Sequence, residues 1–120
     1  MNTGRKLTTP LEDILIAKLI NRIELIEGAI ALILFGSRVS GFSNEYSDLD
    51  IALIVKRPLL HYQLDKIKNE VMEEMDIVGE LRIDLFSFTE DEVKHLPIGK
   101  EIEGKGVILW KKDLSSQRAL

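Results

Sequence analysis

Hydrophobic positions near the start of the chain recur at intervals of three and four residues, which is typical of one buried helix face. The predicted face comprises Leu11, Ile14, Leu15, Leu19, Ile23 and Ile26. Thr9 and Glu12 have the spacing of a capping box at the start of this helix. Gly28 indicates where it ends.

The pattern then changes to short apolar runs separated by polar loops and further amphipathic segments. The expected strands are residues 29–35, 48–55, 81–88 and 107–110. A second helix is predicted between Leu60 and Val78, ended by Gly79. Thr89 begins another capping box, so a short helix is expected there, followed beyond Pro97 by a last helical turn toward residue 103.

The order helix, strand, strand, helix, strand, helix, strand predicts an α/β fold with a small mixed sheet of about four strands packed with helices. The 120 residues and 13.6 kDa suit one domain. We expect residues 1–110 to form this domain and residues 111–120 to form a frayed tail.

Charge and composition exclude several classes of function and several kinds of site. The net charge of −4 disfavours broad electrostatic binding to the phosphates of nucleic acid. The absence of cysteine excludes disulfides, thiolate zinc sites and cysteine nucleophiles. No segment approaches the length of an apolar membrane span, and no signal peptide is evident, so we expect a cytoplasmic protein.

Two aspartates lie at the start of the second predicted strand. Alternate residues of a strand share a face, so Asp48 and Asp50 are expected side by side while Leu49 and Ile51 enter the core. Two such carboxylates repel each other unless a cation neutralises them. Magnesium favours one or two carboxylates completed by substrate phosphates. The pair therefore predicts a magnesium site.

Gly36 and Ser37 follow the first apolar strand. A glycine lets backbone N–H groups approach an anion closely, and the serine hydroxyl adds a donor. Asp84 is expected on the outer face of the third strand. If that strand pairs with the second, Asp84 converges with the two other aspartates, an arrangement suited to two-metal phosphoryl or nucleotidyl transfer.

The combination of Gly36-Ser37, ten residues and Asp48-Leu49-Asp50 resembles the signature of the minimal nucleotidyltransferases, in the DNA polymerase beta-like superfamily. Asp84 matches the family's third carboxylate, and Glu103-Gly104 resembles its usual ending. The resemblance runs from about residue 11 to residue 110 and implies a nucleotidyltransferase-like fold.

By this resemblance, Gly36 and Ser37 hold the β- and γ-phosphates of ATP, and Arg38 meets phosphate charge. The family often carries a second arginine where this chain has Ser40. The three aspartates Asp48, Asp50 and Asp84 are the implied catalytic residues and the ligands of two Mg²⁺ ions.

The implied reaction is transfer of AMP from ATP to a hydroxyl acceptor. Larger relatives add a helical acceptor-binding domain, and short ones often pair with a helical HEPN-type ribonuclease toxin and silence it by adenylylating a tyrosine. We therefore expect a protein adenylyltransferase acting as the antitoxin of such a partner. Two alternatives remain: a homo-oligomer that modifies a small molecule such as an aminoglycoside, and a non-catalytic module that neutralises its partner by docking.

Overall fold

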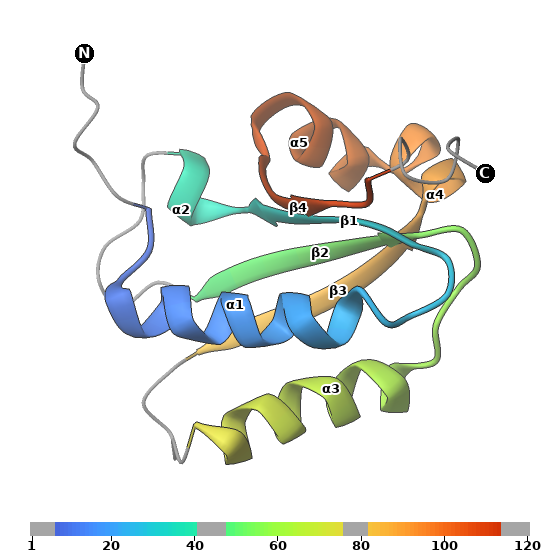
Figure 1. Cartoon of the computed structure of the whole chain (residues 1–120). Helices are drawn as coiled ribbons and strands as arrows, with labels where there is room; N and C mark the ends of the chain where they lie inside the picture. The colour runs from blue at the N-terminus through green and yellow to red at the C-terminus, as the bar shows by residue number, and fades with distance from the viewer. Residues whose placement is uncertain (1–6, 41–47, 76–81, 114–120) are drawn as a thin grey trace.

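The computed structural model describes residues 7–40, 48–75 and 82–113, which form one four-stranded sheet with helices on both faces (Figure 1). The strands are β1 (Ala29–Phe35), β2 (Leu49–Val55), β3 (Ile83–Thr89) and β4 (Val107–Lys111). Their spatial order is β3-β2-β1-β4. β1 is antiparallel to β2 and β4, whereas β2 and β3 are parallel. The predicted mixed sheet is confirmed.

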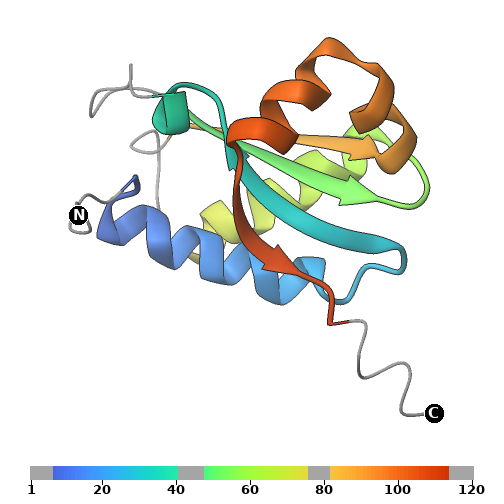
Figure 2. The ribbon, with the colours of Figure 1, turned by 90° about the horizontal axis from the view of Figure 1, so that it is seen from above.

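The helices form two separate layers. α1 (Pro10–Ile23) and α3 (His61–Glu74) cover one face of the sheet, and α4 (Glu90–His95) and α5 (Pro97–Lys105) lie on the other (Figures 1 and 2). The single turn α2 (Ser37–Ser40) follows β1 at the edge where β2 and β3 begin. None of the helices in the described ranges is long and apolar enough to cross a membrane.

Each layer has its own hydrophobic core because the central strands are apolar on both faces. The larger core packs α1 and α3 against Leu32, Leu34, Ile51 and Leu53. The smaller core lies under α4 and α5 and includes Phe35, Ala52, Ile54, Val93 and Ile102. The continuous apolar run that predicted a strand buried on both sides is explained by these two layers.

The capping box at Thr9 and Glu12 is present, as predicted. The buried face of α1 is nevertheless rotated relative to the prediction. Leu11 and Ile14 remain 38% and 50% exposed, while Glu12 is buried. The helix also ends at Ile23, several residues before the predicted glycine stop.

The sheet continues past the predicted domain boundary at residue 110. Lys111 belongs to β4, and the Lys112 N–H donates to the Ile30 carbonyl oxygen. Residues 114–120, the end of the second predicted helix and most of the predicted loop after β1 lie outside the described residues.

Candidate active site

One row of residues crosses three neighbouring strands at the edge of the sheet. Phe35 on β1 is opposite Asp50 on β2, and Asp50 is opposite Asp84 on β3. The predicted pairing of the second and third strands is therefore present, and it brings two of the three aspartates into register. Asp48 precedes β2 by one residue, on the same face as Asp50 by strand alternation.

The carboxylates lie on the face that carries α4 and α5, because their neighbours point the other way. Leu49 and Ile51 are fully buried in the opposite core, as predicted. Asp50 is half-buried and Asp84 is exposed. The row is thus held by apolar packing beneath it and open to solvent at β3.

The surroundings of Asp50 disfavour its charge. Burial raises the pKa of Asp50 above its ordinary value, and the negative charges of Asp84 and Asp48 raise it further. Glu101 on α5 adds a fourth negative charge to this environment. Glu101 could not be predicted as part of this site, because an exposed helical glutamate carries no local signal of what its helix packs against.

Gly36 makes the close approach between the loop and the carboxylates possible. Its φ of +83° lies in the left-handed region, which side chains rarely adopt. A Cβ added at this position would overlap Oδ2 of Asp50. Glycine is therefore required at this site by both backbone conformation and space. Ser37, the first residue of α2, follows directly and is half-buried.

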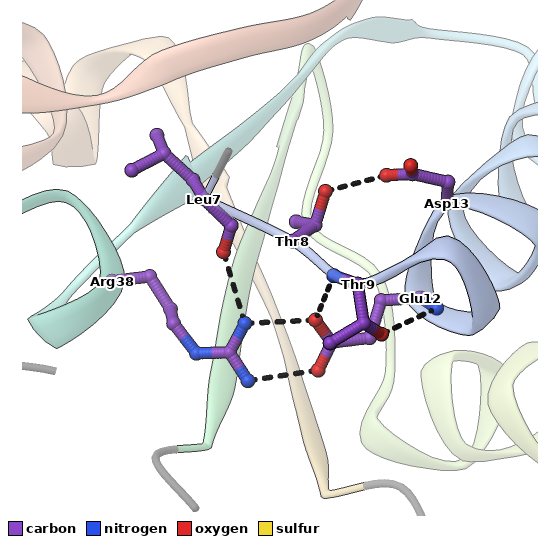
Figure 3. A network of polar contacts seen from close by, with 6 residues as sticks. All are labelled: Leu7, Thr8, Thr9, Glu12, Asp13 and Arg38. Carbon is purple, nitrogen blue, oxygen red and sulfur yellow. Dashed lines mark hydrogen bonds and ion pairs between the residues drawn. The ribbon is translucent and has the colours of Figure 1, made fainter. Parts of the chain in front are cut away.

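The side chain of Arg38 is bound within the protein by a carboxylate that the sequence did not reveal as its partner (Figure 3). Its two terminal nitrogens each donate to a different oxygen of Glu12 at 2.8 Å, and one of them also donates to the Leu7 carbonyl oxygen at 3.0 Å. Both side chains are buried, with 7% and 6% exposed. The ion pair joins α2 to the start of α1.

The same carboxylate completes the helix cap. Glu12 accepts the Thr9 N–H, and the Thr9 hydroxyl accepts the Glu12 N–H. Burial acts to raise the pKa of Glu12, but the hydrogen bonds from Arg38 and Thr9 outweigh it and hold this pKa below its ordinary value. Glu12 is therefore ionised at neutral pH and fully engaged by its neighbours.

The charge of Arg38 also interacts with the aspartates at the start of β2. The hydrogen bond with Glu12 raises the pKa of Arg38, and the charges of Asp48 and Asp50 contribute in the same direction. The expected contact of Arg38 with a phosphate stays a prediction. Arg38 would have to make that contact in addition to its hydrogen bonds with Glu12, or would have to give those bonds up.

Carboxylate oxygens are ligands that magnesium accepts, so the donor set of the row fits this ion. Within the described ranges, however, no three acidic or histidine side chains are grouped so that they could hold a metal ion by themselves. Magnesium sites that bind nucleotides commonly use one or two carboxylates and take the remaining ligands from phosphate and water. The row is compatible with a site of that kind.

The mixed four-stranded sheet, its flanking helices and the position of the loop after β1 define a nucleotidyltransferase-like α/β fold. Residues 9–115 match the family described as "Polymerase beta, Nucleotidyltransferase". The chain therefore belongs to this nucleotidyltransferase family.

Individual relatives agree with the family. A Haemophilus influenzae protein named a probable protein adenylyltransferase, MntA, is 43% identical over 54 residues, which are 45% of this chain and 45% of that protein. The chain thus matches less than half the length of this curated relative.

Two solved structures share the fold. A crystal structure of a toxin–antitoxin pair with AMP-PNP superimposes with a TM-score of 0.57 and 20% identity, over 87% of this chain and 77% of that one. A complex of a tri-AMPylated Shewanella oneidensis HEPN toxin with its MNT antitoxin gives a TM-score of 0.55 and 17% identity, over 89% and 78% of the two chains.

Proposed function

We propose that this protein transfers AMP from ATP to a hydroxyl group of a protein acceptor, and that it acts as the antitoxin of a HEPN-type partner. The observation that carries the proposal is the register of Asp50 with Asp84 beside a glycine loop, in a chain of the nucleotidyltransferase family. The adenylyltransferase name of one relative and the AMPylated toxin bound by another support the acceptor class.

The proposed roles follow the order of the strands. Gly36 and Ser37 hold the β- and γ-phosphates at the end of β1. Asp84, exposed at the start of β3, accepts the proton of the attacking hydroxyl. The acceptor oxygen then forms a bond to the α-phosphorus, the bond from this phosphorus to the bridging oxygen breaks, and pyrophosphate leaves.

Asp48, Asp50 and Asp84 are the residues that would hold two Mg²⁺ ions. Bound magnesium would neutralise charge on the phosphates and favour ionisation of the attacking hydroxyl. The raised pKa of Asp50 supports this assignment, because burial and the neighbouring carboxylates oppose its charge, which a bound cation would help to neutralise.

A direct experiment uses purified protein, magnesium and ATP labelled at the α-phosphate, added to a lysate of the source cells. A parallel sample uses ATP labelled at the γ-phosphate, and another uses the Asp48→Asn/Asp50→Asn variant. We expect one protein band that carries α-label but no γ-label and that depends on both aspartates. That band identifies the acceptor by mass spectrometry.

The other outcomes separate the alternatives. Label in a small molecule instead of a protein would favour a small-molecule nucleotidyltransferase. A HEPN-type partner that stays inhibited by the double variant, with no label in any fraction, would favour neutralisation by docking and would overturn the proposed transfer.

A further inference from the structure

A polar pocket lies at the end of the sheet opposite the acidic row. It is formed by the turn before β1, the connection after β2 and the segment after β4. Its lining residues are Glu27, Gly28, Lys56, Arg57 and Lys112, and its volume is about 290 Å³. Figure 1 shows the first two of these connections at the end of the sheet away from α2. Gly28 and Gly36 lie at the two ends of the seven-residue β1, so the pocket is roughly 20 Å from the candidate active site.

Backbone hydrogen bonds fix the frame that carries the pocket's side chains. The Lys56 N–H donates to the Gly28 carbonyl oxygen at 2.8 Å, and the Lys112 N–H donates to the Ile30 carbonyl oxygen at 2.9 Å. The start of β1 therefore lies between the end of β2 and the end of β4, as the strand order requires. Neighbouring strands are about 5 Å apart, so the Cα atoms of Lys56 and Lys112 are about 10 Å apart. Since both side chains line the pocket, they can reach one ligand between them.

The charges of the pocket are unbalanced. Lys56, Arg57 and Lys112 contribute three positive charges. Glu27 contributes one negative charge. In the part of the chain that the structure describes, no carboxylate forms an ion pair with any of these three cations, whereas the arginines of α1 and α2 are both paired. An anion bound among the three cations would reduce their mutual repulsion.

The size of the pocket and its donors indicate which anion fits. The volume of about 290 Å³ corresponds to about ten water molecules, which is more than a single phosphate group fills. Guanidinium groups bind phosphate oxygens with two parallel hydrogen bonds, and lysine ammonium groups bind them as point charges. Two linked phosphate groups therefore match the pocket in both size and charge.

We propose that this pocket is a binding site for a diphosphate group. Lys56 and Lys112 hold it from the two sides of β1, and the guanidinium of Arg57 adds a third contact. The proposal does not rest on the proposed function, because no residue of the pocket belongs to the candidate active site. The diphosphate is either free pyrophosphate or part of a nucleotide such as ADP, and the two sources differ in whether a nucleoside adds contacts.

The test is isothermal titration calorimetry of the wild-type protein with pyrophosphate, ADP, inorganic phosphate and AMP. EDTA is present, because the acidic row repels phosphate when no cation is bound there. We expect one pyrophosphate per protein, and binding of phosphate and AMP that is weaker by about fivefold or more. ADP that binds more tightly than pyrophosphate would identify a nucleotide as the source, whereas ADP that binds no more tightly would identify free pyrophosphate.

Single substitutions locate the site. Lys56→Gln and Lys112→Gln should each raise the Kd for pyrophosphate about five- to tenfold. Glu27→Gln removes the negative charge from the pocket and should lower this Kd about two- to threefold. Lys66→Gln is the matched control, since Lys66 is an exposed lysine on α3 outside the pocket, and it should leave the Kd unchanged. Thermal unfolding of each variant checks that folded proteins are compared.

Three results would overturn the proposal. Pyrophosphate binding that does not saturate would mean that the wild-type protein has no such site. Equal weakening by Lys56→Gln and Lys66→Gln would mean that pyrophosphate responds only to net charge. A Kd raised by Ser37→Ala but not by Lys56→Gln would place pyrophosphate at the loop after β1. None of these measurements uses adenylyl transfer, so the diphosphate site and the proposed function can fail separately.

Discussion

Arg38 and Glu12, 26 residues apart in sequence, form a buried ion pair with two hydrogen bonds of 2.8 Å. The pair fastens the turn after β1 to the capped start of α1 (Figure 3). Gly36 and Ser37 lie in this turn, so the pair holds the predicted phosphate loop in place. Its consequences for stability and activity can be measured separately.

Removing the cation should be costly because it leaves a buried carboxylate without its main partner. We expect Arg38→Met to lower the free energy of unfolding by about 3–5 kcal/mol in urea denaturation. Arg22→Met is the matched control, since Arg22 is 34% exposed and pairs with Glu70 and Glu74 on the surface. That control should lose less than about 1 kcal/mol. Equal losses in the two variants would contradict a special role for the buried pair.

The activity of Glu12→Gln distinguishes two roles for Arg38. If Arg38 positions α2 through Glu12, loss of the Glu12 charge should raise KM for ATP, and Arg38→Gln should raise it too. If Arg38 binds phosphate by itself, Glu12→Gln should leave KM near the wild-type value or lower it. We expect the first result, read from initial rates at a temperature well below the unfolding midpoint of each variant.

Gly36→Ala should impair both stability and transfer. The substitution meets a positive φ and a clash with the Asp50 carboxylate, so we expect a loss of about 1–3 kcal/mol together with loss of activity. Gly104→Ala is the control, because a Cβ there meets nothing within 4 Å and α5 is helical. It should stabilise the protein by about 0.4–1 kcal/mol. Thermal unfolding of both variants checks the comparison.

Asp50→Asn should stabilise the protein at neutral pH while abolishing transfer. The pKa of Asp50 is raised in the folded state, mainly by burial and then by neighbouring carboxylates, so its ionisation opposes folding. This penalty appears as pH rises above the ordinary value of 3.8 and is complete above the folded-state pKa. The unfolding midpoint of Asp50→Asn should therefore exceed the wild-type midpoint at pH 7.

The difference should shrink as pH falls and vanish well below pH 3.8, where Asp50 is protonated in both states. Magnesium with a nucleotide should raise the wild-type midpoint by more than that of Asp50→Asn, because the variant lacks one of the three proposed metal ligands. A lower midpoint for Asp50→Asn at pH 7 would contradict the description of Asp50 as a destabilised charge.

Much of the fold could be predicted because its signals are local. The apolar run 29–35 coincides with β1, and the capping boxes at Thr9 and Thr89 begin α1 and α4. The convergence of Asp84 with Asp50 was predicted from one assumption, that the second and third strands are neighbours, and the structure adds that the two aspartates lie directly opposite each other. The features that were missed depend on how the elements pack.

The buried face of α1 is one such feature. Ile14 fits the helical period as well as Ile16 does, and only the position of the sheet decides that Ile16 is buried and Ile14 exposed. Glu12 was recognised as a cap but not as the partner of Arg38. Its position did contain a signal, because Glu12 lies at helical spacing from the buried Leu15 and Leu19 and is therefore expected on the buried face. A buried carboxylate requires a cation, so a basic partner could have been expected.

The most direct test of the proposed mechanism is the initial rate of α-label transfer by Asp84→Asn, measured on the acceptor band with magnesium and ATP. Asp65→Asn is the matched control, because Asp65 is an exposed aspartate on α3, which covers the other face of the sheet. We predict that Asp84→Asn loses activity by about 100-fold or more, while the control retains the wild-type rate. Transfer by Asp84→Asn at the wild-type rate would contradict the assignment of Asp84 as the group that accepts the acceptor's proton.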